Sequence, residues 1–267
     1  MRVHHLNCGT FRPPLAPEMV AHVLLVERPE GLLLVDTGLG TTDLAHPARL
    51  GRPFRTVVRP ALDPAETALA QVTALGFAAG DVTDVVLTHL DLDHVGGIGD
   101  FPSARVHVFE REYDAATRPA LTERGRYVAA QWAHGPRWVL HAEPGDSWLG
   151  LPAVTALDDD VLLVPLPGHS RGHCGVAVRR DDGHWLVHAG DAVFDGDQLR
   201  DPPRCHRGLA AFQAMVAVDN KARRANEERL RELATGHTGE VTVFCAHDKA
   251  QLDALAGAAA GDDVTGG

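Results

Sequence analysis

The sequence is poor in cysteine, and its cysteines are scattered. Only four occur in 267 residues, and they form no Cys-x-x-Cys pair: Cys8, Cys174, Cys205 and Cys245. This spacing excludes a zinc ribbon and a thioredoxin-type redox motif. Reduced thiols are the default for such a chain, and we predict a cytoplasmic protein.

Long apolar segments are also missing. No apolar run approaches the roughly 20 residues that a bilayer-spanning helix needs. The N-terminal segment, residues 1–5, lacks the apolar core of a secretory signal. We therefore expect neither a membrane-spanning segment nor a membrane partner.

Positive charge is in short supply. The 25 Lys and Arg residues are outnumbered by 36 Asp and Glu residues, which gives a formal net charge of −11. Nucleic acids and anionic membranes attract basic surfaces, so this balance argues against both as partners. We expect a small-molecule substrate instead, and we leave a homodimer open.

The chain also lacks an internal linker and a short-period repeat. Its length allows a sizeable buried core, and its 45% hydrophobic content is ordinary for a globular protein. We predict a single domain over residues 1–260 and a disordered tail over residues 261–267. The predicted elements show a rough duplication, in which strands and a helix, a ligand-bearing loop, and strands and a helix follow one another.

Short apolar segments rich in β-branched residues predict the strands. Two hairpins are expected, each with a turn of Gly, Pro or Asp between its strands: residues 20–27 with 32–36, and residues 174–180 with 184–189. Single strands are expected at four further places: residues 82–87, 104–109, 161–166 and 241–245.

Helices are expected where capping residues precede a helical pattern. Asp63 is a typical N-cap and Pro64 a typical first helical residue, which predicts a helix over residues 63–75. Other helices are expected at residues 110–116, 123–133, 207–234 and 250–259. The charge run in the third of these is interpreted as a solvated face: Lys221, Arg223, Arg224, Glu227, Glu228 and Arg231. Residues 40–62 show no clear period and are expected to form a long loop that lines a site, and residues 134–160 are expected to be rich in loops.

Potential metal ligands follow four of the expected strands. Histidine is abundant, with 16 residues, and the richest cluster comes directly after the strand 82–87: His89, Asp91, Asp93 and His94. Three more candidates follow later strands: His169, Asp191 and His247. Imidazoles and carboxylates bind zinc and similar divalent ions. Seven ligands are too many for one tetrahedral ion, so we predict a two-metal site with a bridging carboxylate and a bridging water.

This ordered set resembles the metallo-β-lactamase superfamily. The motif His-x-Asp-x-Asp-His at 89–94, the three later ligands and the Asp-Thr-Gly at 36–38 all match it. Within the superfamily the chain looks most like the N-acyl homoserine lactonase and glyoxalase II-like branch, because of four segments: residues 5–9, 167–173, 190–192 and 246–248. The resemblance implies an α/β (α+β) fold, the four-layer αββα sandwich, with the site at one edge.

The resemblance also implies a role for each ligand. His89, Asp91 and His169 would hold the first ion, Asp93, His94 and His247 the second, and Asp191 would bridge them. The implied cofactor is a pair of divalent ions, with zinc as the first expectation. The implied reaction is attack of a bridging hydroxide on an ester, lactone or thioester. Asp93 would also act as a catalytic residue that takes the proton of the water.

Two positions depart from the family pattern. The family usually has histidine where this chain has Asp91. A carboxylate is a harder, anionic donor, which shifts the metal preference toward manganese or iron. The alternative that Asp91 supports the ligands without binding the metal itself stays open. Homoserine lactonases usually carry tyrosine three residues after the bridging aspartate, where this chain has Phe194. Phenylalanine has no hydroxyl with which to polarise a carbonyl or to protonate a leaving group.

These departures keep two other functions open. One is a di-iron or mono-iron oxidoreductase of the same fold, although the flavin domain with which di-iron relatives pair does not fit in this length. The other is a weakly catalytic, ligand-binding member. Nearby polar residues are interpreted as supporting ones: Asp36 anchors a loop, His173 orients a ligand or a loop, and His188 packs in its strand.

Overall fold

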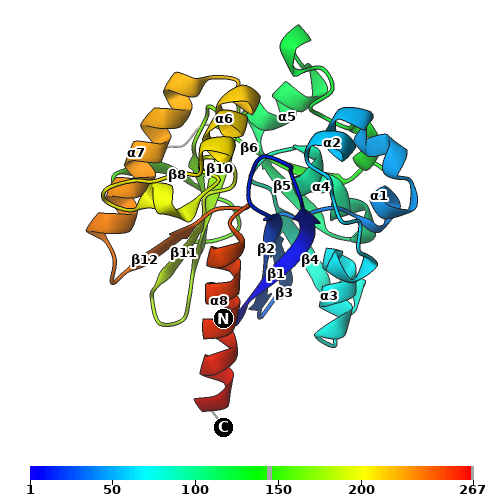
Figure 1. Ribbon diagram of the computed structural model, residues 1–267. Coiled ribbons are helices and arrows are strands. Elements are labelled where there is room, and N and C mark those ends of the chain that lie inside the picture. Colours follow the sequence, from blue (N-terminus) through cyan, green and yellow to red (C-terminus); the bar gives the residue numbers. More distant parts are fainter. Residues whose placement is uncertain (143–145, 266–267) are drawn as a thin grey trace.

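The computed structural model describes residues 1–142 and 146–265, which form two six-stranded sheets with helices outside them (Figure 1). The first sheet has the order β1-β2-β3-β4-β5-β6. Its first three strands are antiparallel and the next three continue parallel to β3. The strands are β1 (Val3–Phe11), β2 (Met19–Arg28), β3 (Gly31–Val35), β4 (Val82–Val86), β5 (Arg105–Phe109) and β6 (Arg137–His141).

The second sheet is built from the later half of the chain and has the order β12-β11-β10-β9-β8-β7. All its neighbours are antiparallel except β11 and β12, which are parallel. The strands are β7 (Asp146–Trp148), β8 (Leu151–Thr155), β9 (Val161–Pro165), β10 (Cys174–Arg179), β11 (Trp185–His188) and β12 (Val241–Phe244). The rough duplication expected from the sequence corresponds to this division into one sheet per half.

Three apolar cores hold the layers together. The central core joins the facing sides of the two sheets and includes Leu24 and Val35 from the first sheet and Leu163 and Val176 from the second. A second core lies between the outer side of the first sheet and its helices, and a third lies between the second sheet and α7 (Asn220–Gly236). This arrangement confirms the predicted four-layer αββα sandwich.

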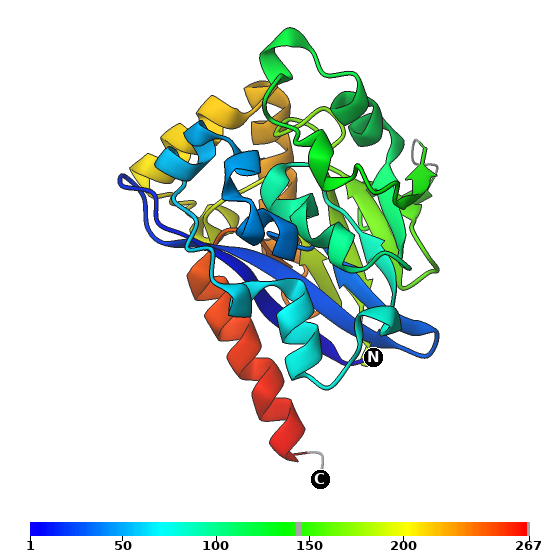
Figure 2. The same cartoon turned by 90° about the vertical axis from the view of Figure 1, so that its right-hand side faces the viewer.

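The remaining helices are mostly short. They are α1 (Thr41–Ala45), α2 (Arg52–Val57), α3 (Ala68–Ala74), α4 (Leu92–Val95), α5 (Glu110–Thr117), α6 (Arg207–Val216) and α8 (Lys249–Thr265). Short 3₁₀ helices occupy Pro47–Leu50, Pro64–Glu66, Ala79–Asp81, Gly96–Asp100, Leu121–Glu123, Ala129–Gln131 and Gly196–Leu199. Figure 2 shows how α8 extends away from the body of the molecule.

Both predicted hairpins and the four other predicted strands are present, but β1, β6, β7 and β8 were not predicted. Three of these are edge strands, β1 and β6 in the first sheet and β7 in the second. An edge strand carries fewer buried apolar residues than a central one, so it lacks the apolar run used to predict strands. The segment 134–160, which was expected to be rich in loops, therefore also contains the short strands β6, β7 and β8.

Two predictions for segments near the site, one of a helix and one of a loop, were wrong. The segment 123–133 is not one helix, since only Leu121–Glu123 and Ala129–Gln131 are helical and Gly125 has a φ of +94°. The segment 40–62 contains α1 and α2 rather than a continuous loop. Helices of five or six residues are too short to show a helical period in the sequence.

The predicted helices 63–75 and 207–234 are each divided into two elements by a capping residue. Asp63 accepts a hydrogen bond from the amide of Ala65 (2.9 Å), as predicted, but it caps a 3₁₀ turn. Thr67 is the N-cap of α3, the helix that follows. The predicted helix 207–234 is divided into α6 and α7, because Asp219 starts a new helix by accepting from the amides at 221 and 222.

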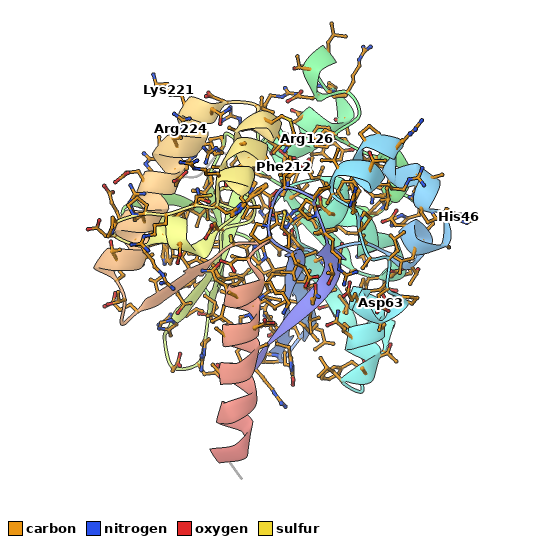
Figure 3. The ribbon with its side chains drawn as sticks, in the orientation of Figure 1. His46, Asp63, Arg126, Phe212, Lys221 and Arg224 are labelled. Atoms are coloured by element: carbon orange, nitrogen blue, oxygen red, sulfur yellow. The ribbon has the colours of Figure 1, made fainter. Side chains whose placement is uncertain are left out.

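The charged residues of α7 only partly form the expected exposed face. Figure 3 shows Lys221 and Arg224 on the outer side of the helix. Arg223, in contrast, is buried and donates a hydrogen bond to Glu227 (2.8 Å). The interpretation of this charge run as a solvated face therefore holds for Lys221 and Arg224 but was wrong for Arg223.

The C-terminal helix is longer than expected. It was predicted to end near residue 259, with a disordered tail from 261, but α8 continues to Thr265; residues 266 and 267 lie outside the described part. Within the part that the structure describes, neither α8 nor another helix combines the length and apolar content needed to cross a membrane. The single domain over residues 1–260 stays a prediction.

Candidate metal centre

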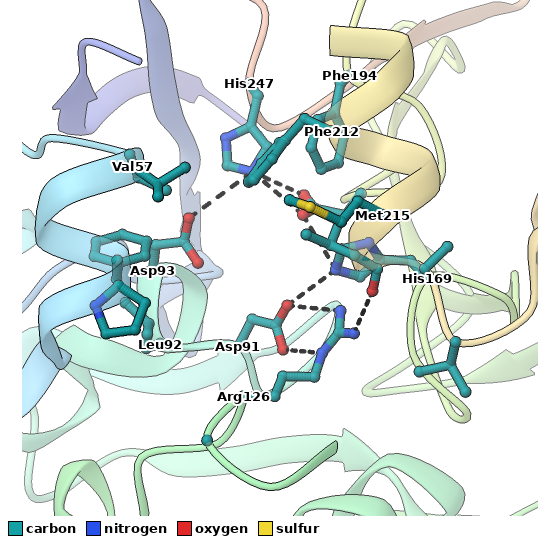
Figure 4. Close-up of a pocket in the computed structure, with 18 of the residues that line it drawn as sticks. Val57, Asp91, Leu92, Asp93, Arg126, His169, Phe194, Phe212, Met215 and His247 are labelled. Atoms are coloured by element: carbon teal, nitrogen blue, oxygen red, sulfur yellow. Dashed lines mark hydrogen bonds and ion pairs between the residues drawn. The ribbon is translucent and has the colours of Figure 1, made fainter. Parts of the chain in front are cut away.

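The seven candidate ligands lie together on loops that follow four different strands. His89 follows β4, Asp91 occupies the N-cap position of α4, and Asp93 and His94 belong to α4. The other three follow strands of the second sheet, β9, β11 and β12: His169, Asp191 and His247. The site thus takes four candidates from the first half of the chain and three from the second, and Figure 4 shows several of them around the pocket.

Asp191 lies at the centre and faces both groups of imidazoles. Its Oδ2 atom is 3.3 Å from Nε2 of His169 and 3.8 Å from Nε2 of His89. Its Oδ1 atom is 3.2 Å from Nε2 of His94 and 3.1 Å from Nε2 of His247. Oδ2 thus faces His89 and His169 and Oδ1 faces His94 and His247, while Nε2 of His247 also lies 3.3 Å from Oδ2.

Two sets of ligand atoms are close enough to hold ions. One set comprises His89, Asp91, His169 and Asp191, and the other Asp93, His94 and His247; within each set the ligand atoms lie within 4.8 Å of one another. The side chain of Asp93 is 14% exposed, close to the 16% of Asp91, and its Oδ2 atom is 3.9 Å from Nε2 of His247. Imidazole and carboxylate donors in this number suit divalent first-row metals.

Several of these atoms are buried without a hydrogen-bond partner among the described residues. They are Nε2 of His89, Nε2 of His94 and Oδ1 of Asp191. A buried polar atom without a partner costs free energy, and native structures rarely leave one unsatisfied. Bound cations would satisfy all three, so the residues present fit a metal centre.

Hydrogen bonds to Nδ1, the ring nitrogen that points away from Asp191, orient three of the histidines as metal ligands. Nδ1 of His94 donates to Oδ2 of Asp36 (2.9 Å), and Nδ1 of His247 donates to the carbonyl of Val20 (2.7 Å). Nδ1 of His89 is 2.9 Å from Oγ1 of Thr88, whose hydroxyl donates to Asp36 (2.8 Å). When these rings are neutral, the contacts leave the lone pair on Nε2, which faces Asp191.

Burial and the mutual charges shift the pKa values of the cluster. Burial, together with the neighbouring His94, lowers the pKa of His89 to about 4, so His89 is a neutral donor at neutral pH. Burial acts to raise the pKa of Asp191, but His247 and His94 outweigh it and hold that pKa well below its usual range. Burial raises the pKa of Asp93.

The supporting roles expected for Asp36, His173 and His188 are confirmed. Asp36 accepts from the amide of Thr88 (2.8 Å) besides its bond to His94, which anchors both ends of the motif. Nε2 of His173 accepts from the amide of Asp191 (2.9 Å). His188 is fully buried in β11 and bonds the carbonyl of His22.

The turn that presents Asp191 requires glycine. Gly190 has a φ of +53°, and a Cβ atom there would lie 2.6 Å from Nε2 of His173. Both the backbone angle and the lack of space exclude a side chain. The close approach brings His173 within reach of the amide of Asp191, so the glycine and the histidine position the aspartate together.

Arg126 is a functional residue that the sequence analysis missed. Its Nε and Nη2 atoms donate to the two oxygens of Asp91, at 2.5 Å and 2.8 Å, while Oδ2 of Asp91 is also 2.9 Å from Nε2 of His169. Burial acts to raise the pKa of Asp91, but Arg126 and then His89 hold it well below its usual range. Asp91 thus lies in the cluster and is bound to a cation at the same time. Because an aspartate in place of a histidine adds a negative charge, a compensating cation is expected nearby, but nothing in the sequence shows which residue supplies it.

Glu112 of α5 is a second residue that was missed. It is completely buried and accepts hydrogen bonds from the amides of Leu90 and Gly172 (both 3.1 Å) and from the hydroxyl of Ser170 (2.6 Å). These donors flank the candidate ligands of the two halves, so one carboxylate ties both loops together. Burial raises the pKa of Glu112.

We expect Glu112→Gln to lower the metal affinity of the centre by about 10- to 100-fold, as is typical for residues that position ligands. The amide would put its NH₂ group against N–H and O–H donors, because both carboxylate oxygens of Glu112 act as acceptors. Bound metal per chain after dialysis against a weak chelator measures the effect. Glu110→Gln, at an exposed position of the same helix, is the control, and equal metal content in the two variants would contradict the assigned role.

A largely apolar pocket of about 580 Å³ opens onto the centre. Asp91, Asp93, His169, Asp191 and His247 contribute to its polar end. Its apolar walls come from α2, from Phe194 and from α6 with the residues after it: Phe54, Val57, Phe194, Phe212, Met215, Val216 and Val218. The expectation that the segment 40–62 lines a site is confirmed.

Phe194 lies against the metal-facing histidines. Its ring centroid is 5.0 Å from that of His247 and 5.9 Å from that of His169, and its side chain is 1% exposed. No tyrosine is among the described residues that line the pocket. A proton donor for a leaving group must therefore come from another group than a tyrosine hydroxyl.

Comparison with known proteins gives a family match over most of the chain. The model of the metallo-beta-lactamase superfamily matches residues 16–247. A Mycobacterium tuberculosis protein named "Probable metallo-hydrolase" is 44% identical over 253 residues, which cover 93% of this chain and 80% of that protein. An N-acyl homoserine lactonase of Rhizobium radiobacter is 29% identical over 233 residues, which cover 86% of this chain and 82% of the lactonase.

Solved structures share the fold at low identity. An N-acyl homoserine lactone hydrolase with its product N-hexanoyl-L-homoserine at the catalytic metal centre superposes with a TM-score of 0.73 at 19% identity, covering 95% of each chain. A Staphylococcus aureus protein described as a "probable metal-dependent hydrolase" gives a TM-score of 0.66 at 16% identity, covering 92% of this chain and 89% of the other. At such identities the likeness concerns the sandwich fold.

Proposed function

Because the chain belongs to the metallo-beta-lactamase superfamily, we propose that it is a hydrolase that cleaves an ester, lactone or thioester at a centre of two divalent metal ions. The observation that carries the proposal is the position of Asp191, with one oxygen toward His89 and His169 and the other toward His94 and His247. A carboxylate that faces two sets of imidazoles is suited to bridge two ions.

The ligands divide as the two sets of atoms do. His89, Asp91 and His169 would hold the first ion, and Asp93, His94 and His247 would hold the second, with Asp191 placed between them. Zinc is the proposed metal, with manganese or iron as alternatives that the carboxylate of Asp91 favours. When bound, the ions supply Lewis acidity and lower the pKa of a coordinated water.

The residues of the chain orient the substrate and move the proton. The apolar walls from α2 and α6 bind an apolar substituent of the substrate and exclude water, while its carbonyl points at the polar end of the pocket. Asp93 lines that end, and it accepts the proton of the attacking water because the carboxylate of Asp91 is already bound to Arg126. Asp93 can then return this proton to the leaving group, which Phe194 cannot do.

The lactonase activity proposed here has support from several relatives. The 29% identical Rhizobium radiobacter protein is named an N-acyl homoserine lactonase, and the pocket has the apolar walls that an acyl chain would need. Lactones are accordingly the first substrate class to try. Thioesters and simple esters share the same electrophilic carbonyl and come next.

A substrate panel with metal analysis tests the proposal. The purified protein is stripped with a chelator, reconstituted with zinc, manganese or iron, and assayed with lactones, thioesters, phosphodiesters and β-lactams. We expect about two ions per chain, turnover of the lactones or the thioesters in the reconstituted protein, and no turnover in the stripped protein. Two irons together with oxygen or nitric oxide reduction, and no hydrolysis, would instead support an oxidoreductase.

A further inference from the structure

We propose that Arg126 is a positioning residue that allows Asp91 to take the place of a histidine ligand, so that the Asp91–Arg126 pair acts as one neutral donor unit. This inference rests on the proposed metal centre. The superfamily usually has a neutral imidazole at this position, whereas the chain has a carboxylate. A carboxylate adds one negative charge to the first ligand set, and a guanidinium bound to it removes that charge again.

The contact between the two side chains is close and two-pronged. Nε of Arg126 donates to Oδ1 of Asp91 (2.5 Å) and Nη2 donates to Oδ2 (2.8 Å), as Figure 4 shows. Both side chains are largely buried, with exposures of 13% and 16%. Paired hydrogen bonds between a guanidinium and a carboxylate fix the plane of the carboxylate, which a single point charge would not do.

This orientation presents one oxygen of Asp91 to the candidate ligands. Oδ2 is the atom that lies 2.9 Å from Nε2 of His169 and 3.4 Å from Nε2 of His89. Oδ1 makes the shorter of the two contacts with Arg126. Asp91 is therefore arranged to bind a metal through Oδ2 alone, with the geometry of a single imidazole nitrogen rather than of a two-oxygen chelate.

Arg126 is itself held in place by the pocket wall. Its Nη1 atom donates to the carbonyl of Val216 (2.8 Å), the last residue of α6. A cation is favoured at the C-terminal end of a helix, where carbonyl groups are left without partners. Three N–H groups of the guanidinium are engaged in these contacts, so the structure assigns Arg126 to the protein's own carboxylate and helix end rather than to a substrate anion.

A double-mutant cycle tests the pairing. In Asp91→His the restored imidazole stands beside an uncompensated guanidinium, so we expect first-ion affinity to fall about tenfold or more and metal content to approach one ion per chain. Adding Arg126→Gln removes that cation, and the double variant should return to about two ions per chain. Arg126→Gln alone should keep two ions but bind the first more weakly in chelator competition, because Asp91 remains a ligand and loses the hydrogen bonds that orient it.

The measurements are metal content after dialysis and chelator competition, and neither depends on catalytic activity. Adding Arg124→Gln to Asp91→His is the matched control, since Arg124 is an exposed arginine of the same loop, and it should restore nothing. Should Asp91→His not fold, as judged by thermal unfolding, Asp91→Asn with and without Arg126→Gln gives the same comparison with a smaller change of shape.

Two outcomes would overturn the inference. One is a single variant, Asp91→His, that binds two ions as tightly as the wild type while Arg126 is present. The other is a double variant that binds no better than the single one. A wild-type chain that binds no divalent ion would contradict the proposed function itself, so the two failures are distinguishable.

Discussion

Asp191→Ala is expected to lower the rate of hydrolysis by about 10³-fold or more and to reduce the bound metal below two ions per chain. The substitution removes the one carboxylate whose oxygens lie within 3.3 Å of His169 on one side and within 3.2 Å of His94 on the other. A 10³-fold loss corresponds to about 4 kcal/mol of transition-state stabilisation, the size expected when a two-metal centre is disrupted.

Metal content and kcat of the substituted protein measure the effect. Asp159→Ala, at an exposed position before β9, is the control for a lost carboxylate and should leave both quantities unchanged. Alanine at 191 also removes the negative charge that attracts the facing histidines. Circular dichroism should therefore accompany the assay to show that the fold persists. If a folded Asp191→Ala protein hydrolyses its substrate at the wild-type rate, the dinuclear mechanism is wrong.

Gly168→Ala is expected to cost about 3–5 kcal/mol of unfolding free energy, the range in which backbone strain and overpacking combine. Gly168 has a φ of +141°, and a Cβ atom there would lie 2.4 Å from the amide nitrogen and 2.6 Å from Cα of Arg223. Backbone atoms of a helix cannot move aside as a flexible side chain can. The turn before His169 would have to shift away from α7.

Urea unfolding measures this cost, and metal content shows whether His169 has moved. Gly80→Ala serves as the control, because a Cβ atom at Gly80 meets nothing within 4 Å and the change should stay within about 0.5 kcal/mol. An unchanged midpoint in Gly168→Ala would mean that the contact with α7 is looser than these distances indicate.

The candidate site could be predicted from the sequence because its residues follow strands. Buried strands such as β4 and β9 are continuous apolar runs, so their ends are visible, and His89 and His169 stand just beyond them. Strands that share a sheet edge bring such loops together, and this held for all seven candidates. Their division into two ion sites, zinc as the metal, the cytoplasmic location and a homodimer stay predictions.

The groups that support the site could not be predicted, because they act across the fold. Arg126 lies in a segment for which the sequence predicted a helix, and no periodic pattern relates it to Asp91, 35 positions earlier. Glu112 reads as an ordinary polar residue in the first turn of α5, yet it is completely buried. Its partners lie in two loops that only the packing of both sheets brings together.

The break between α6 and α7 links the wall of the pocket to the backbone around His169. The amide of Val218 donates to the carbonyl of His169 (3.1 Å), and the amide of Asp219 donates to that of Gly168 (2.9 Å). Val218 also lines the pocket, together with Met215 of α6. Substitutions that reshape this wall for a new substrate will therefore be epistatic with the ligand loop. An evolving lineage of this chain would have to change its substrate range through replacements that spare these two hydrogen bonds, which makes α2 the freer wall for divergence.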